Sequence, residues 1–275
     1  MNEYDTLVLS GASSKALTFL GALQYCYDFG LIRNVKNYVG TSAGAMICFF
    51  LAIGYSPSDI IVYICVQQLM DKMLNFNILS MIQGGGAMTF NPIQESIEKM
   101  TIEKIGYLPT LNDLKEKFDV NLTVVTYNLS KQKVVYLNYK THPNFPCVTA
   151  LKMSGNLPLV FEKFKYGTDY YIDGGIADNF PLRKGEEIGK HVLALALSGS
   201  VKKYDHSNSI LEYIYSLMFI PIKSDQKNQI LQKSEESTVA LLESNNLKFF
   251  DFKISTREKL DMFSEGYRQM KKILI

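Results

Sequence analysis

The sequence lacks an excess of charge of either sign, and it lacks a cysteine pattern. Its 275 residues carry 29 lysines and arginines against 27 aspartates and glutamates. A net charge of +2 gives no support for nucleic acid as a partner. The four cysteines have no CxxC spacing, and three of them lie in apolar helical segments. They indicate buried free thiols in a reducing compartment and no disulfide framework.

Long apolar runs and nucleotide-binding loops are also lacking. The apolar run at 43–54 is well short of the roughly 20 residues that span a bilayer. The start of the chain, at 1–5, carries two acids and leads into a strand, which is not the pattern of a signal peptide. Neither G-x-x-x-x-G-K nor G-x-G-x-x-G occurs in the first strand-helix loop. No repeat or linker divides the chain, so we expect one domain over 1–275 in a soluble, cytoplasmic protein.

Apolar and β-branched runs alternate along the chain and predict a mixed α/β protein. Strands are predicted at 6–9, 37–39, 122–127, 133–138, 170–172, 192–197 and 248–254. Helices are predicted at 16–29, 47–53, 60–74, 93–100, 110–118, 146–153, 210–220, 226–243 and 256–274. The C-terminal portion, 205–275, is therefore expected to be mainly helical.

One short motif suggests nucleophilic catalysis. Gly40, Ser42 and Gly44 fit G-x-S-x-G, the nucleophile elbow, in which a serine sits on a strained strand-to-helix turn. The predicted strand at 37–39 and the apolar helix at 47–53 supply the setting that this pattern requires. The first amides of such a helix also face whatever the serine attacks. The alternative interpretation is a small-residue turn with an ordinary serine.

Two further loops hold candidate groups. The small residues at 10–14 lie between a strand and a helix, where backbone amides suit a phosphate or an oxyanion, although a connection without a ligand fits equally well. Asp173 ends a predicted strand and precedes two glycines, which is typical either of a catalytic aspartate or of a turn aspartate that bonds its own backbone. Asp178 is interpreted as surface or structural. The glycines at 84–86 are interpreted as a flexible loop.

The order and spacing of these motifs resemble the patatin-like phospholipase family, which are lipid acyl hydrolases with a Ser-Asp dyad. The similarity spans residues 6 to about 198. It rests on Gly40-Thr41-Ser42-Ala43-Gly44 and Asp173-Gly174-Gly175, with support from Leu20-Gly21-Ala22-Leu23, from Ser154 with Pro158 and Phe161, and from Asn179-Phe180-Pro181.

The resemblance implies a fold, a reaction and a set of roles. The fold is a three-layer α/β/α arrangement with a central, mostly parallel sheet. Ser42 is the nucleophile and Asp173 the base, and the amides of Gly11, Ala12 and Ser13 form the oxyanion hole. The reaction is a phospholipase A-type cleavage of an acyl ester through an acyl-enzyme intermediate, with no metal and no cofactor.

The first loop departs from the family's pattern. Family members usually have three or four glycines and then a basic residue and another glycine, whereas this loop reads Ser10-Gly11-Ala12-Ser13-Ser14-Lys15-Ala16. Alanine and serine also possess amide N–H groups, but their β-carbons restrict the backbone torsions that aim those groups.

Two other functions stay open at this point. A Ser-His-Asp esterase would use His206, which follows a predicted strand, whereas His191 lies at the wrong end of that strand and His142 precedes the aspartate. A non-catalytic lipid-binding or scaffold protein would retain the fold without turnover.

The expected partners are a phospholipid or another acyl lipid and, transiently, a membrane surface. The helix at 210–220 and the loop at 81–90 are the candidate contacts with that surface, and Lys202, Lys203 and Lys223 flank the helix. For the helix, packing in the core is the alternative.

Overall fold

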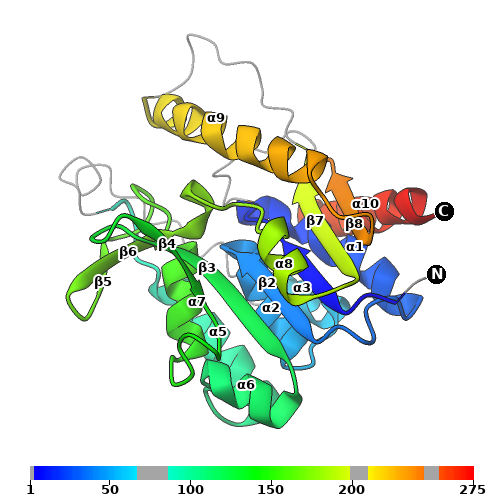
Figure 1. Cartoon of the computed structure of the whole chain (residues 1–275), viewed down its shortest axis with the longest axis horizontal. Coiled ribbons are helices and arrows are strands. Elements are labelled where there is room, and N and C mark those ends of the chain that lie inside the picture. Colours follow the sequence, from blue (N-terminus) through cyan, green and yellow to red (C-terminus); the bar gives the residue numbers. More distant parts are fainter. Residues whose placement is uncertain (1–2, 67–85, 199–209, 245–253) are drawn as a thin grey trace.

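The computed structural model describes residues 3–66, 86–198, 210–244 and 254–275. Within these residues an eight-stranded sheet has the order β5-β6-β3-β2-β1-β7-β8, and β4 pairs with β3 beside that path. Figure 1 shows the sheet with helices packed around it. The strands are β1 (Thr6–Leu9), β2 (Asn37–Thr41), β3 (Asn121–Asn128), β4 (Lys133–Leu137), β5 (Phe164–Tyr166), β6 (Asp169–Asp173), β7 (Val192–Leu197) and β8 (Ser237–Leu242).

The described helices include two short 3-10 helices, η1 (Ser13–Ala16) and η3 (Gly174–Ile176), which flank the later site. The α-helices are α1 (Leu17–Asp28), α2 (Ala43–Ala52), α3 (Pro57–Val66), α5 (Asn91–Ile105), α6 (Leu111–Phe118), α7 (Cys147–Gly155), α8 (Leu182–Ile188), α9 (Ile210–Leu231) and α10 (Thr256–Leu274).

The sheet is covered on both faces. Strand β1 is fully buried, and its side chains alternate between two apolar clusters. Leu7 and Leu9 pack with α1, α2, α7 and α10, whereas Val8 packs with α8 and the end of α9. Strands β1, β2, β3, β7 and β8 run parallel. Continuous apolar runs such as β7 are expected in parallel strands that are buried on both faces. The three-layer α/β/α fold with a mostly parallel sheet is therefore confirmed.

Strand β3 has two different neighbours along one edge. Residues 121–125 pair with β2 in parallel, and residues 126–128 pair with β6 in antiparallel orientation. Because β4 pairs with β3 over 124–128, it occupies the opposite edge. Strands β2 and β6 therefore meet with their carboxyl ends facing each other on the same edge of β3.

The C-terminal portion differs from the prediction. The predicted helix at 226–243 is wrong, because α9 ends at Leu231 and residues 237–242 form β8, which pairs in parallel with β7. The strand contains only four consecutive apolar residues, at 239–242, and periodicity alone does not separate a strand from a helix in so short a run. Helix α9 also extends beyond the predicted end at 220 and contains Pro221.

Most other predicted elements agree with the structure within a few residues, including α10, whose Ser255 capping box is present. Helix α7 continues through Ser154 and Gly155, which were expected to lie in a loop. The predictions at 67–74 and 248–253, and the glycines 84 and 85, lie outside the described residues. None of the described helices is by itself long and apolar enough to cross a membrane, and the pair α2 and α3, bent by 119°, passes that test only together.

Candidate active site

The junction on β3 places Ser42 beside Asp173. Thr41, the last residue of β2, is paired with Val125, and Asp173, the last residue of β6, is paired with Thr126. Ser42 follows Thr41 directly, so the serine and the aspartate leave the sheet at neighbouring positions. Residues far apart in the sequence are thus brought together by two strand ends.

Ser42 occupies a strained turn between β2 and α2. Its backbone has φ 55° and ψ −126°, a region that residues with a β-carbon rarely adopt. The two flanking glycines are required for close approach: a β-carbon at Gly40 would lie 2.6 Å from the Ala45 backbone, and one at Gly44 would lie 2.5 Å from the Ser10 carbonyl oxygen. The turn therefore joins a strand to a helix through a strained backbone that the two glycines permit.

The serine hydroxyl contacts the carboxylate directly. Ser42 Oγ donates a hydrogen bond to Asp173 Oδ2 at 2.6 Å, and the Gly175 amide donates to Asp173 Oδ1 at 2.7 Å. Asp173 is 4% exposed. Burial raises the pKa of Asp173 to about 6, and the two hydrogen bonds offset only part of this effect. The carboxylate is consequently a stronger base than an exposed aspartate and is still ionised at neutral pH.

Ser154 supports the elbow from α7. Its side chain is fully buried, and its Oγ accepts a hydrogen bond from the Ser42 amide at 2.8 Å. The same Oγ donates to the Val125 carbonyl oxygen at 2.6 Å. Ser154 therefore ties the backbone of the nucleophile candidate to the central strand. The sequence marked Ser154 only through the resemblance, because no local pattern reveals a contact between residues so distant in the chain.

The loop that leads into η1 is anchored to the segment after Asp173. The Gly11 amide donates to the Asn179 carbonyl oxygen at 2.9 Å, and Asn179 Nδ2 donates to the Gly11 carbonyl oxygen at 3.2 Å. The Gly11 amide is thus already engaged. Ser13 has φ 51°, whereas Ala12 has φ −149°. Within the described residues no hydrogen bond engages the amide of Ala12 or Ser13.

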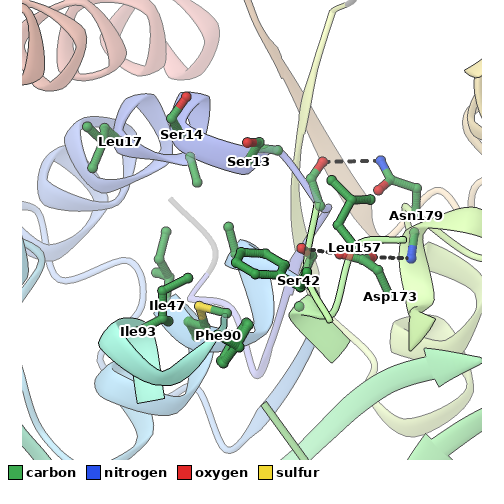
Figure 2. Close-up of a pocket in the computed structure, with 18 of the residues that line it drawn as sticks. Ser13, Ser14, Leu17, Ser42, Ile47, Phe90, Ile93, Leu157, Asp173 and Asn179 are labelled. Atoms are coloured by element: carbon green, nitrogen blue, oxygen red, sulfur yellow. Dashed lines mark hydrogen bonds between the residues drawn. The ribbon is translucent and has the colours of Figure 1, made fainter. Parts of the chain in front are cut away.

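An apolar pocket of about 200 Å³ opens beside Ser42. Figure 2 shows Asp173 and Asn179 on one side of Ser42, and Leu17, Ile47, Phe90 and Ile93 on the other. Side chains from α9 also line the pocket, among them Tyr215, Met218, Phe219 and Ile222. The pocket suits a hydrocarbon chain better than a polar group, because it offers little to hydrogen-bond.

The remaining candidates lie elsewhere or are engaged. Asp178 is 9% exposed, and it accepts hydrogen bonds from Tyr136 at 2.7 Å and Gln229 at 3.2 Å, so of the two expected roles the structural one fits. His191 precedes β7, at the end of the sheet opposite Ser42, and contacts Glu236 at 3.1 Å. His206 lies outside the described residues. No group of potential metal ligands occurs among the described residues.

Comparison with known proteins identifies the family of this α/β fold. The family model for patatin-like phospholipases matches residues 7–184. The chain therefore belongs to the patatin-like phospholipase family, as the sequence motifs indicated.

Individual relatives and structures are similar over different shares of their length. The probable lipid hydrolase 463L of Invertebrate iridescent virus 6 is 33% identical over 188 residues, which are 65% of this chain and 62% of the viral protein. The uncharacterized protein YqhO of Bacillus subtilis is 24% identical over 95% of both chains. This chain therefore spans less than two thirds of the viral relative.

Two solved structures share the fold. VipD from Legionella pneumophila has a TM-score of 0.60 at 18% identity, covering 99% of this chain and 67% of that chain. ExoU, in its complex with SpcU from Pseudomonas aeruginosa, has a TM-score of 0.53 at 18% identity, covering 99% of this chain and 51% of the other.

The buried carboxylate makes stability depend on pH in a direction that can be tested. Because the pKa of Asp173 is raised from 3.8 to about 6, the folded state binds its proton more tightly, and the free energy of unfolding falls as pH rises between these values. The informative quantity is the free energy of unfolding of Asp173→Asn minus that of the wild type. We expect this difference to be about 1–3 kcal/mol more positive at pH 8 than at pH 4. Chemical denaturation across this range measures the difference.

Asp113 provides a control of opposite sign. Hydrogen bonds from Thr110, in the capping box of α6, lower the pKa of Asp113 to about 2. Asp113→Asn should therefore destabilise the protein at neutral pH, and this loss should shrink as pH falls toward 2. Equal pH profiles for the two variants would show that burial of Asp173 does not control its ionisation.

Proposed function

We propose that this protein is a lipid acyl hydrolase of the phospholipase A type, which cleaves fatty acyl esters of phospholipids or related lipids through Ser42 and Asp173. The observation that carries the proposal is the 2.6 Å hydrogen bond from Ser42 Oγ to Asp173 Oδ2 at the mouth of an apolar pocket. Membership of the patatin-like phospholipase family and the likeness to a probable viral lipid hydrolase support the substrate class.

The contact supports a two-step reaction. Asp173 Oδ2 accepts the hydroxyl proton while Ser42 Oγ forms a bond to the ester carbonyl carbon. The tetrahedral intermediate then expels the alcohol portion of the lipid, which takes the proton from Asp173 and leaves an acyl-enzyme. Water then attacks that acyl group while Asp173 accepts a proton from the water. The bond from the acyl carbon to Ser42 Oγ breaks, Oγ takes the proton from Asp173, and the fatty acid is released. A pKa near 6 suits this work, because the group is ionised at neutral pH and still binds a proton readily.

The oxyanion that forms on the carbonyl oxygen requires amide donors. Ala12 and Ser13 line the pocket beside Ser42, and so does Ala43, the first residue of α2. We assign the stabilising amides to these three residues, because the Gly11 amide is engaged by Asn179. Gly11 holds the loop in place.

The alternative functions find less support. A Ser-His-Asp triad places a histidine between the serine and the acid, whereas here Ser42 contacts Asp173 directly. A scaffold without turnover would follow if the η1 loop failed to aim its amides. The positive φ of Ser13 shows that a residue with a β-carbon is accommodated in this loop, which favours turnover.

Helix α9 supports work at a lipid surface. Leu217 and Ile220 are 48% and 64% exposed, while Met218 and Ile222 line the pocket. The helix is thus apolar on two faces, one toward the pocket and one toward solvent. This arrangement suits a helix that lies on a bilayer next to the entrance for substrate. Of the other surface candidates, Lys202, Lys203 and residues 81–85 lie outside the described residues.

Removal of either reacting group should abolish turnover of a fluorogenic acyl ester. We expect Ser42→Ala and Asp173→Asn each to lower kcat by about 10³-fold or more, because the loss of one member of a catalytic unit removes most of the rate enhancement that the whole unit provides. In the wild type, kcat/KM should fall about tenfold per pH unit below pH 6, where Asp173 is protonated. Stopped assays with purified proteins across pH measure both effects.

His206→Ala is the matched control. A Ser42–Asp173 dyad uses no histidine, so the rate of ester turnover should be unchanged in this variant. A chelator should likewise leave turnover unchanged. Wild-type rates in Ser42→Ala would remove Ser42 as the nucleophile, and a large loss in His206→Ala would replace the dyad by a triad.

The η1 loop predicts a contrast at Ser13. Since its φ is 51°, Ser13→Gly should keep kcat within about threefold, whereas Ser13→Val should lower it by at least tenfold, because a β-branched residue resists a positive φ. Single-turnover acylation rates separate this effect from product release. Equal rates for the two variants would show that this amide does not stabilise the oxyanion.

The two faces of α9 predict separable defects. Leu217→Asp and Ile220→Asp should weaken co-sedimentation with anionic vesicles while their melting temperatures stay close to that of the wild type, because both side chains are exposed. Met218→Asp, which faces the pocket, should instead impair turnover of a soluble ester. Unchanged vesicle binding in both exposed variants would mean that this face does not contact lipid.

A further inference from the structure

The helix that begins after the nucleophile also forms one wall of the pocket. Ala43, Met46, Ile47 and Phe50 of α2 line it, which is the i, i+3, i+4, i+7 spacing of a single helix face. This face starts next to Ser42 and runs away from it along the helix axis. The neighbouring Phe49 does not line the pocket and is fully buried in the main core.

A second helix lines the pocket with the same periodicity. On α5 the lining residues are Ile93, Ile97 and Met100, again on one face, together with Ser96. Ser96 Oγ donates to the Pro92 carbonyl oxygen at 2.9 Å, so its polar group is satisfied within its own helix. The pocket is therefore bordered along its length by apolar side chains.

Helix α3 lines the pocket near the carboxyl end of α2, which is the end of that helix away from Ser42. It leaves the carboxyl end of α2 at an angle of 119° and contributes Ile60, Tyr63 and Ile64 to the lining. Ile60 is 2% exposed and packs in the main core. A chain that enters beside Ser42 and follows α2 thus meets a wall at its far end.

We propose that this pocket measures the length of a single acyl chain, with Phe50 and the α3 side chains as its floor. The inference rests on the proposed function, because the ester carbonyl must sit at Ser42 for the chain to lie along α2. The pocket accepts one unbranched hydrocarbon chain end to end and leaves the rest of the lipid outside.

The length of the α2 face sets the expected chain. From Ala43 to Phe50 the helix rises about 10.5 Å, at about 1.5 Å per residue. An extended hydrocarbon advances about 1.25 Å per carbon, given carbon-carbon bonds of about 1.5 Å. About eight carbons beyond the carbonyl therefore reach the floor.

The test is a series of nitrophenyl esters from butanoate to octadecanoate, assayed below their micelle-forming concentrations. We expect kcat/KM to rise by up to about fourfold per added methylene, which corresponds to about 0.8 kcal/mol, and to stop rising near decanoate. A rise that continues at the same rate to octadecanoate would overturn the proposal.

Variants locate the floor. Phe50→Ala should move the optimum to longer esters, and Ile47→Phe, which narrows the channel midway, should lower the ratio of decanoate to butanoate kcat/KM by at least tenfold. Phe49→Ala is the matched control, since it removes a buried ring from the same helix outside the pocket and should leave the optimum in place. Equal shifts in Phe49→Ala and Phe50→Ala would refute the assignment.

A binding measurement separates this proposal from the proposed function. Calorimetric titration of Ser42→Ala protein with the fatty acid series should give affinities that level off near decanoate, whether or not the wild type turns over esters. Affinity that keeps rising, or no binding of any fatty acid, would refute the length measurement. Absent turnover together with levelling affinity would refute only the catalysis.

Discussion

The meeting of two strand ends on one edge of β3 is the constraint on which the site depends. Val125 pairs with Thr41 and the next residue, Thr126, pairs with Asp173, so the sheet fixes the distance between the two segments that carry Ser42 and Asp173. A parallel strand and an antiparallel strand must end at the same point for this to occur. The Val125 carbonyl oxygen also accepts a hydrogen bond from the Ser154 hydroxyl, and the oxygen of that hydroxyl accepts one from the Ser42 amide. A shift of β6 by one residue would turn Asp173 to the opposite face of the sheet.

Both candidate catalytic groups are held in states that are unfavourable in isolation. Ser42 has a backbone conformation that costs on the order of 1–3 kcal/mol, and Asp173 is a carboxylate removed from water. Surrounding residues stabilise both states. Two glycines permit the turn, Ser154 accepts a hydrogen bond from the Ser42 amide, and the Gly175 amide donates one to Asp173. Burial of the large apolar cluster around α1, α2 and α10 stabilises the fold and offsets the free-energy cost of these two states.

Residue patterns predicted the local parts of this arrangement, whereas the pairing of Ser42 with Asp173 came only from the family resemblance. The elbow at Ser42 and the strand-end aspartate are local patterns, since glycine spacing and an apolar run are visible within a dozen residues. The engagement of Gly11 by Asn179 and the role of Ser154 depend on contacts across more than 100 residues, which periodicity does not encode. The predicted helix at 226–243 failed for another reason: the apolar run 239–242 is too short for periodicity to separate a strand from a helix, and pairing with β7 decides its conformation.

In the proposed function, helix α2 links the position of the nucleophile to the choice of substrate. Its first turn presents Ser42, one face borders the pocket, and another face is held in the core by Phe49 and by Cys48, whose thiol donates to the Val39 carbonyl oxygen at 3.5 Å. Ser42 and this wall of the pocket therefore belong to one rigid body. Because a helix advances by a fixed rise per residue, the distance from Ser42 to Phe50, the part of the proposed floor that lies on α2, cannot change without moving the serine itself. A wall built on a separate loop would lack this coupling, and a chain of the wrong length could then settle with its carbonyl away from Ser42.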